Sequence, residues 1–185
     1  GLEVMNNKPR LAIQVLKKLK KIETITSRTL AFQFAPLMNA AGRLKDADIA
    51  VRFLLSNERQ EAEEIAKILD ATNLDRREKE SDMIQIALDL AEEQKNNSAL
   101  ILVSPKFHEG VNGIVATRLV ERFYKPVLIL SENEGKIKGS GRSIPELNLK
   151  EVLSECSDLL ERFGGHAAAA GCSLIPEHLS AFRDR

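Results

Sequence analysis

The sequence predicts an α/β protein in which a helical N-terminal segment and a long connector helix precede an α/β domain with a mixed sheet flanked by helices. Three observations lead to this prediction. Apolar residues recur at helical spacing near the N-terminus, one long helical stretch follows, and from Ala99 onward apolar strands alternate with helical segments. Such alternation is typical of a mostly parallel or mixed sheet that is covered on both faces.

The N-terminal segment is expected to be mainly helical. From Leu11 onward apolar residues recur at helical spacing with lysines opposite them, which predicts a helix over Pro9–Ile22. Pro36 is expected to break any helix that precedes it. A polar link over Thr24–Thr29 and a helix over Ala47–Leu55 complete this segment.

A long helix is expected from about Arg59 to Lys95, with Asn57 as its N-cap and glutamates in its first turns, where the helix dipole favours them. Its stripe is apolar at both ends and polar in the middle, at Asn73, Arg76 and Glu80. This pattern favours a connector that docks a different body at each end over a merely solvated face. The expected domains are residues 1–57, 58–97 and 98–185.

The second half of the chain is expected to alternate strands with helices and to end in a glycine-rich stretch. Gly164 and Gly165 give the backbone freedom, His166 stands where a short alanine helix is expected to begin, and Gly171 is expected to end that helix. The expected strands are Ala99–Val103, Val127–Leu130, Lys136–Ser143 and Cys172–Ile175, and the longer helices are Val111–Phe123 and Leu149–Phe163.

The Gly-Gly-His stretch is the first candidate site. A helix that opens at His166 presents free N–H groups and a positive dipole end, which suit a phosphate or a carboxylate. The alternative is an ordinary glycine turn into a short helix with a capping or packed histidine. From these residues alone the two interpretations are equally supported.

Two further stretches carry groups for binding anions. Ser140 lies between two glycines and Arg142 follows, so hydroxyl, backbone and guanidinium donors can converge on one anion. Asn39-Ala-Ala-Gly-Arg43 places a guanidinium beside small residues, and His108 lies in a loop between an expected strand and helix. The alternatives are a strand bulge that needs glycine at Ser140, and pairing of Arg43 with Asp46 or Asp48.

The composition of the chain limits the classes of function that it can have. Formal net charge is zero and the chain has no Trp and one Tyr, so a polyanion site must be local and broad stacking on bases is not expected. Two cysteines without metal spacing indicate reduced thiols in a cytoplasmic protein. No signal peptide or membrane span is expected. The chain has three histidines and no Asp-rich cluster, and a phosphate-binding half-site without its metals fits a piece of a longer enzyme better than a complete hydrolase.

The motifs together resemble a known family. Gly164-Gly-His-Ala-Ala-Ala-Ala-Gly171 is similar to the signature of the DHH-associated domain in DHH-superfamily phosphoesterases. Pro36–Arg43, His108–Arg122 and Gly139–Ser143 resemble stretches of the RecJ family of single-strand-specific exonucleases, in the same order along the chain. Asn73, Arg76 and Glu80 are also similar to that family's connector.

The resemblance implies the function of a parent enzyme, a 5′–3′ exonuclease that hydrolyses phosphodiester bonds of single-stranded DNA in recombination and repair. Two Mn²⁺ or Mg²⁺ ions would be bound by an N-terminal Asp-His-His lobe that this sequence lacks, so the chain alone is expected to be inactive. Residues 1–57 would then be the C-terminal helical part of that lobe. Single-strand-binding protein and a helicase are the implied partners, and no membrane is involved.

The resemblance also implies roles for individual residues. His166 and Arg43 would act at the scissile phosphate, and Ser140, Arg142, Gly164, Gly165, His108 and Asn39 would bind substrate phosphates. The alternatives are a nanoRNase or pAp-phosphatase type of DHH phosphoesterase lobe and a non-catalytic nucleic-acid-binding module. Asn39 to Arg43 and the His108–Arg122 stretch favour the first interpretation.

Overall fold

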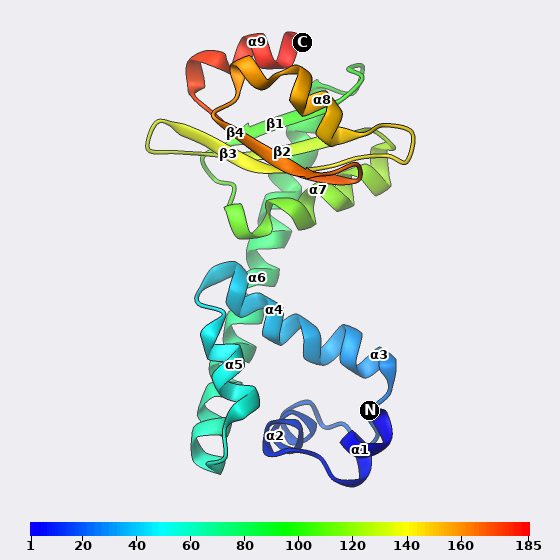
Figure 1. Cartoon of the computed structure of the whole chain (residues 1–185), viewed down its shortest axis with the longest axis vertical. Coiled ribbons are helices and arrows are strands. Elements are labelled where there is room, and N and C mark those ends of the chain that lie inside the picture. The colour runs from blue at the N-terminus through cyan, green and yellow to red at the C-terminus, as the bar shows by residue number, and fades with distance from the viewer. The chain divides into compact units, whose positions relative to one another are not determined.

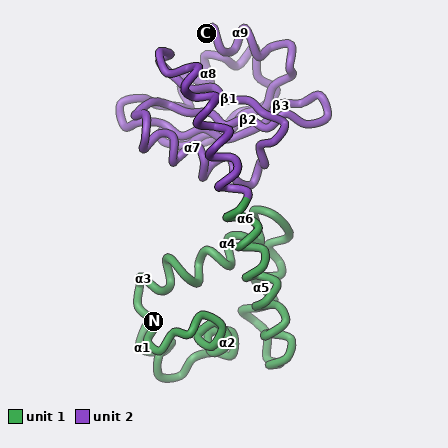
Figure 2. The backbone as a smooth tube through the Cα atoms, turned by 180° about the vertical axis from the view of Figure 1, so that it is seen from behind, with its two compact units in different colours: residues 1–78 green, residues 79–185 purple.

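The computed structural model describes residues 1–185, which form two compact units, Gly1–Glu78 and Lys79–Arg185 (Figure 2). Unit 1 is helical, and unit 2 contains a mixed five-stranded sheet flanked by helices. The predicted fold class is therefore confirmed. Helix α6 (Arg59–Glu93) contributes residues to both units, and no helix has the length and apolar character needed to cross a membrane.

Unit 1 is organised around one apolar core. Leu16, Leu37, Phe53 and Leu69 come from four different helical segments and are each at most 1% exposed. The Asn6 side chain ties the first helix to the chain that follows α2, because its amide exchanges two hydrogen bonds with the backbone of Ile25, at 2.8 and 2.9 Å. The helical segments are α1 (Leu2–Asn7), α2 (Leu11–Lys20), α3 (Ser27–Thr29), η1 (Leu30–Phe34), α4 (Ala35–Leu44), α5 (Asp48–Leu55) and the first half of α6.

The chain is helical from Ser27 to Leu44, so the predicted link over Thr24–Thr29 and the predicted break at Pro36 are wrong. Thr26 and Thr29 form a reciprocal capping box that begins the helix early. The segment η1 then has π-helical hydrogen bonding, in which the Ala35 N–H donates to the carbonyl five residues back. Pro36 follows in the first turn of α4, where a missing N–H is tolerated.

Helix α6 begins at Arg59, one residue later than an Asn57 N-cap requires. The Ala62 N–H donates to the Glu58 carbonyl at 3.0 Å, so Glu58 occupies the N-cap position. The predicted extent of this helix is otherwise confirmed. Its middle is less solvated than its composition suggests, since Asn73 is 4% exposed and accepts a hydrogen bond from Arg76 Nη2 at 3.0 Å.

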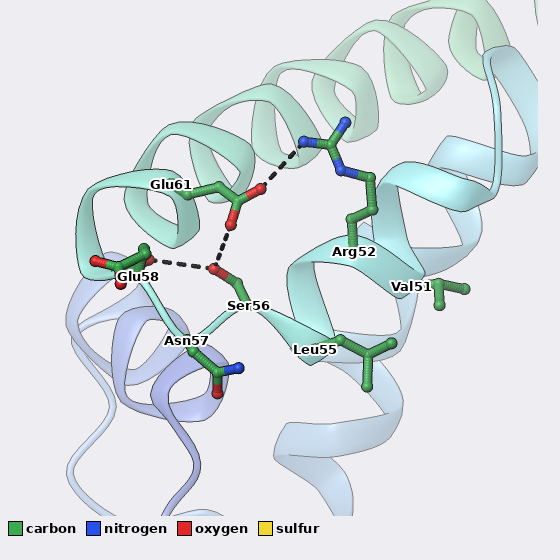
Figure 3. A pocket seen from close by; sticks show the side chains of 7 residues that line it. All are labelled: Val51, Arg52, Leu55, Ser56, Asn57, Glu58 and Glu61. Carbon is green, nitrogen blue, oxygen red and sulfur yellow. Dashed lines mark hydrogen bonds and ion pairs between the residues drawn. The ribbon is translucent and has the colours of Figure 1, made fainter.

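A polar network closes the turn between α5 and α6 (Figure 3). Arg52 Nη2 donates to Glu61 Oε1 at 3.1 Å, and the Ser56 hydroxyl contacts Glu61 Oε2 at 2.9 Å and the Glu58 carbonyl at 3.2 Å. The Arg52 guanidinium holds the pKa of the Glu61 carboxyl below its ordinary value. The network borders a hollow of about 370 Å³ beside Val51 and Leu55.

Unit 2 is a sheet with strand order β1-β2-β3-β5-β4, in which β1 and β2 are parallel and the other pairs are antiparallel. Helix α7 packs on one face, against β2 and β3, and α8 and α9 cover the other face (Figure 1). Both faces are thus covered, as the alternating pattern predicted. The bounds are β1 (Leu100–Ser104), α7 (Glu109–Phe123), β2 (Val127–Asn133), β3 (Lys136–Arg142), α8 (Leu149–Glu155), η2 (Ser157–Leu159), β4 (Arg162–His166), β5 (Ala169–Leu174), η3 (Pro176–His178) and α9 (Leu179–Asp184).

The glycine-rich stretch forms a β-hairpin, and the predicted alanine helix after His166 is wrong. Strands β4 and β5 pair antiparallel with Ala167 and Ala168 in the turn. The carbonyls of these two alanines accept hydrogen bonds from the N–H groups of Leu149 and Ser143, at 2.9 and 3.0 Å. These partners from distant parts of the chain satisfy the turn backbone and outweigh the helix propensity of alanine.

The helix before the hairpin is shorter than predicted. Helix α8 ends at Glu155 instead of reaching Phe163, and a 3₁₀ turn over Ser157–Leu159 follows it. Leu149 and Leu153 are each 1% exposed and Cys156 is 4% exposed, so the short helix already buries its apolar face against the sheet. The remaining residues are then available to form the edge strand β4.

Candidate nucleic-acid interface

Strand register brings most of the predicted anion-binding residues of unit 2 onto one surface. Ser140 is paired with Gly171, and Gly171 is paired with Gly164. In the next row Ala169 is paired with both Arg142 and His166. Residues paired directly across antiparallel strands point to the same face, and residues two apart on a strand share it.

We call this surface the ledge. It consists of three rows across β3, β5 and β4. The middle row has only small side chains, because it consists of a serine and two glycines. One outer row has a basic residue at each end, and the other has an arginine at one end and a histidine at the other. The rows are Lys138–Ser173–Arg162, Ser140–Gly171–Gly164 and Arg142–Ala169–His166.

The ledge is open to solvent where β4 and β5 form it. All five residues of β4 are exposed. In β5, Ala170, Cys172 and Leu174 are buried against the α8 side of the sheet, whereas Ala169, Gly171 and Ser173 are partly exposed. Helix α7 lies on the same face as the ledge but covers β2 and β3, so the ledge extends beyond this helix.

Arg142 lies at the boundary between α7 and the ledge. A Cβ atom added to Gly113 of α7 would lie 2.8 Å from Arg142 Nη2, so the guanidinium packs where this helix lacks a side chain. Arg142 Nη1 also donates to the Gly141 carbonyl at 2.8 Å. The guanidinium is therefore held against the helix instead of extending freely into water.

The polar residues near the start of α7 serve mainly to hold the structure. His108 is the N-cap of this helix, and its Nδ1 accepts the Gly110 N–H at 3.1 Å. Glu109 Oε2 pairs with Lys138 Nζ at 2.6 Å, which offsets one of the basic charges on the ledge. The capping bond accounts for the position of His108, so its predicted contact with phosphate stays a prediction.

Asn112 is a buried polar residue that the sequence did not single out. Its Nδ2 donates to the Ser131 hydroxyl at 2.9 Å, and its Oδ1 has no hydrogen-bond partner. The pair joins α7 to β2 on the face that carries the ledge.

One indication of the ledge was present in the sequence. Lys138, Ser140 and Arg142 are two residues apart in a predicted strand, so they are expected to point to the same face of the sheet.

The adjacent glycines of β4 differ in their surroundings. Gly165 has φ of +140°, and an added Cβ would lie 2.4 Å from the Ala169 carbonyl oxygen, so the protein itself requires glycine there. At Gly164 an added Cβ would meet nothing within 4 Å. Gly164 belongs to the middle row of the ledge, so the open space above it is available to a ligand.

The remaining predicted site residues lie in unit 1. Asn39 and Arg43 are four residues apart on α4 and both are exposed, so they share one face of that helix. Leu37, Ala40 and Ala41 are buried on the other side of α4. The structure thus supports one exposed polar face on α4 and one ledge on the sheet of unit 2.

The donor set of the chain was tested for a metal centre. No group of three or more His, Cys, Asp or Glu side chains is placed to hold a metal ion anywhere in residues 1–185. The residues present therefore do not form the two-metal centre that the resemblance implies for the parent enzyme.

Known proteins resemble this chain in sequence. Residues 96–185 match the DHHA1 domain. The Bacillus subtilis protein named single-stranded-DNA-specific exonuclease RecJ is 42% identical over the whole chain, and the Escherichia coli protein of the same name is 38% identical over 88% of it. The chain spans 24% and 30% of these two relatives, respectively.

Solved structures give the same result. The crystal structure of exonuclease RecJ bound to manganese covers 100% of the chain with a TM-score of 0.86 and 31% identity, and the chain covers 46% of it. The Thermus thermophilus RecJ structure in complex with Mn²⁺ also covers 100% of the chain, with a TM-score of 0.84 and 30% identity, and the chain covers 28% of it.

Proposed function

The chain belongs to the RecJ family, with a DHHA1 domain over residues 96–185, and from this premise we propose that it supplies the strand-holding part of a 5′–3′ exonuclease specific for single-stranded DNA. The observation that carries the proposal is the ledge. By register, Ser140, Arg142, Gly164 and His166 share one face of the sheet, on which Gly164 and His166 are exposed and Ser140 and Arg142 are half-buried. We further propose that the parent protein works in DNA recombination and repair in the cytoplasm, where its two free cysteines stay reduced.

The chemistry of the ledge suits a sugar–phosphate backbone better than bases. Its nine residues include three cations, one histidine and no aromatic side chain other than that imidazole. Phe163 is paired with Cys172, so its ring belongs to the opposite face of the sheet. Contacts to phosphates position a strand without reading its sequence, which is what an enzyme that degrades a strand of any sequence requires.

We propose tasks for five of the nine ledge residues. The Arg142 guanidinium, which packs against α7 and donates one hydrogen bond to the Gly141 carbonyl, contacts a phosphate through its remaining donors, and the Ser140 hydroxyl donates beside it. The lack of side chains at Gly164 and Gly171 allows the sugar–phosphate backbone of the DNA strand to approach the sheet closely. We propose a catalytic role for His166 in unit 2 and, separately, for Arg43 in unit 1, and phosphate-binding roles for Asn39, Gly165 and His108.

The hydrolytic step requires groups from the rest of such a protein. The RecJ structures that resemble this chain are described as bound to manganese or in complex with Mn²⁺ or Mg²⁺, and each is longer than this chain. We propose that two such ions would be held by residues outside 1–185 and would supply Lewis-acid chemistry to the parent enzyme. Single-strand-binding protein and a helicase are the partners we expect for the parent protein.

A binding titration tests the role of the ledge. The chain is titrated against a fluorescent 5′-phosphorylated oligothymidylate by anisotropy, at several salt concentrations. We expect Arg142→Ala and His166→Ala each to weaken binding, and Arg142→Ala to lower the salt slope by about 0.7, the value for one phosphate contact on a single strand. Lys150→Gln, an exposed cation outside the ledge, serves as the control. Unchanged affinity in both ledge variants would contradict the proposal.

The isolated chain is expected to bind single-stranded DNA without cleaving it. The physical reason is that it has no group of three or more His, Cys, Asp or Glu side chains placed to hold the metal ions that hydrolysis needs. The check is a nuclease assay of the purified chain with Mn²⁺ or Mg²⁺, beside a full-length RecJ protein as the positive control. Turnover by the chain that EDTA abolishes would show that the expectation is wrong.

A further inference from the structure

Helix α2 in unit 1 presents a one-sided row of basic residues. Gln14 and Lys17 lie on one face of this helix, and Arg10 and Lys21 are its N-cap and C-cap residues, four residues before Gln14 and four after Lys17. We call Arg10, Lys17 and Lys21 the basic stripe. The opposite face packs into the core of unit 1 through Ala12, Val15 and Leu16.

The basic stripe differs from its neighbours on the same helix in having no counter-charge. Lys18 Nζ lies 3.4 Å from Glu63 and Lys20 Nζ lies 2.5 Å from Asp70. Acidic residues of α6 therefore pair with these two lysines of α2. The side chains of the stripe make no ion pair and no hydrogen bond within residues 1–185. Three charges, on the exposed Arg10 and Lys21 and the half-buried Lys17, therefore have no ion-pair partner.

Local helix stability does not account for the stripe. Lysines in the last turn suit the negative end of the helix dipole, but Arg10 is the N-cap residue at the positive end, and the first turn has no acidic residue. Gly1–Thr29 contains seven basic and two acidic residues, although the whole chain has no net charge. Soluble surfaces usually mix both signs, and a single-sign field is typical of steering toward a charged partner.

We propose that the basic stripe is a second contact surface for the sugar–phosphate backbone of single-stranded nucleic acid. The proposal rests on the proposed function, which supplies the chemical class of the partner. Steps of one or two helical turns between the cations, about 6 Å and 10 Å along the axis, allow successive phosphates of an extended strand to be neutralised. The exposed face of α2 has no large exposed apolar residue that would anchor an acidic peptide.

The test compares two variants of equal charge. The stripe variant is Arg10→Gln/Lys17→Gln/Lys21→Gln, and the control variant is Lys67→Gln/Lys136→Gln/Lys150→Gln, whose side chains are exposed and have no ion pair. Both are titrated with fluorescent 20-residue oligothymidylate at salt concentrations from about 50 to 300 mM. We expect the stripe variant to lower the salt slope by about 2, as three phosphate contacts require, and the control to change it much less.

The outcomes separate this proposal from the role of the ledge. Weakening by the stripe variant alone supports the stripe and contradicts the ledge, whereas weakening by Arg142→Ala alone overturns the stripe. Equal slopes in the stripe and control variants also overturn it. A fluorescent polyglutamate peptide is titrated in parallel, and loss of peptide binding in the stripe variant with unchanged oligothymidylate binding would assign the stripe to an acidic protein instead.

Discussion

Gly164 and Gly165 are adjacent in β4, yet a methyl group has a different effect at each. Gly165 needs a positive φ, and its Cβ would overlap the backbone of β5 at the Ala169 carbonyl. Gly164 faces open space on the ledge. A glycine that the fold does not require, on a surface that carries the candidate binding groups, points to a ligand that needs the space.

This difference predicts opposite results for two alanine variants. Gly165→Ala is expected to lower the free energy of unfolding by about 1–3 kcal/mol, because the new side chain is strained in that conformation. Gly164→Ala is expected to leave stability unchanged or to raise it by about 0.5 kcal/mol, since alanine loses less backbone entropy, yet to weaken oligothymidylate binding. Urea unfolding and anisotropy measure the two effects. Full binding by a stable Gly164→Ala protein would show that the space above the ledge is not used.

Cys172 makes a prediction about alkaline pH. Burial raises the pKa of its thiol from 9.0 to about 12, with a smaller contribution from Cys156. The folded state therefore keeps the proton when the unfolded state has lost it. The contribution of this thiol to the free energy of unfolding is fully present below pH 9 and is lost as the pH rises from about 9 to about 12.

The measurement is urea unfolding at pH 8 and pH 10 for the native protein and for Cys172→Ala. The native protein is expected to lose more stability between these pH values than the variant does, because only the native protein has the Cys172 thiol, whereas both proteins have the buried Cys156 thiol. Reaction of the folded protein with a thiol reagent at pH 8 is also expected to be slow. Equal losses in both proteins would show that Cys172 is not the group responsible.

At the scale of elements, periodicity predicted most of the fold correctly. The apolar spacing in α2, α5 and α7 and the apolar runs of β1 and β2 are local signals, and these elements lie where they were expected. The hairpin of β4 and β5 was missed because its alanines favour helix, while the bonds from Ser143 and Leu149 that hold its turn come from remote parts of the sequence. The continuous helix through Pro36 was also missed, because a π-helical segment directly before the proline compensates for it.

The candidate site shows the same limit. Ser140, Arg142 and the two glycines could be proposed from residue types alone, but the ledge depends on which residues pair across β3, β5 and β4. One residue of register shift would move Arg142 to the opposite face from His166. His108 caps α7, a structural role that the sequence reasoning did not assign to it, and its predicted contact with phosphate stays a prediction.

At the scale of the whole molecule, the chain has separate apolar cores. Phe53 lies in the core of unit 1 and Leu130 lies between the sheet and α8 of unit 2, and both are 0% exposed. Each core draws its buried residues from one unit. Each unit is therefore expected to keep its own stability when the other core is damaged.

This expectation can be tested with one cavity variant in each core. Phe53→Ala is expected to cost about 3–5 kcal/mol and Leu130→Ala about 2–5 kcal/mol, because each removes a buried side chain and leaves a cavity. Native-state hydrogen exchange is then expected to show lost protection in α2 and α5 for Phe53→Ala, with β2 and β3 unchanged, and the reverse for Leu130→Ala. Amides of α6 are not diagnostic, because this helix contributes to both units. If either variant lowered protection equally in the helices of unit 1 and in the sheet, the two units would unfold as one cooperative body.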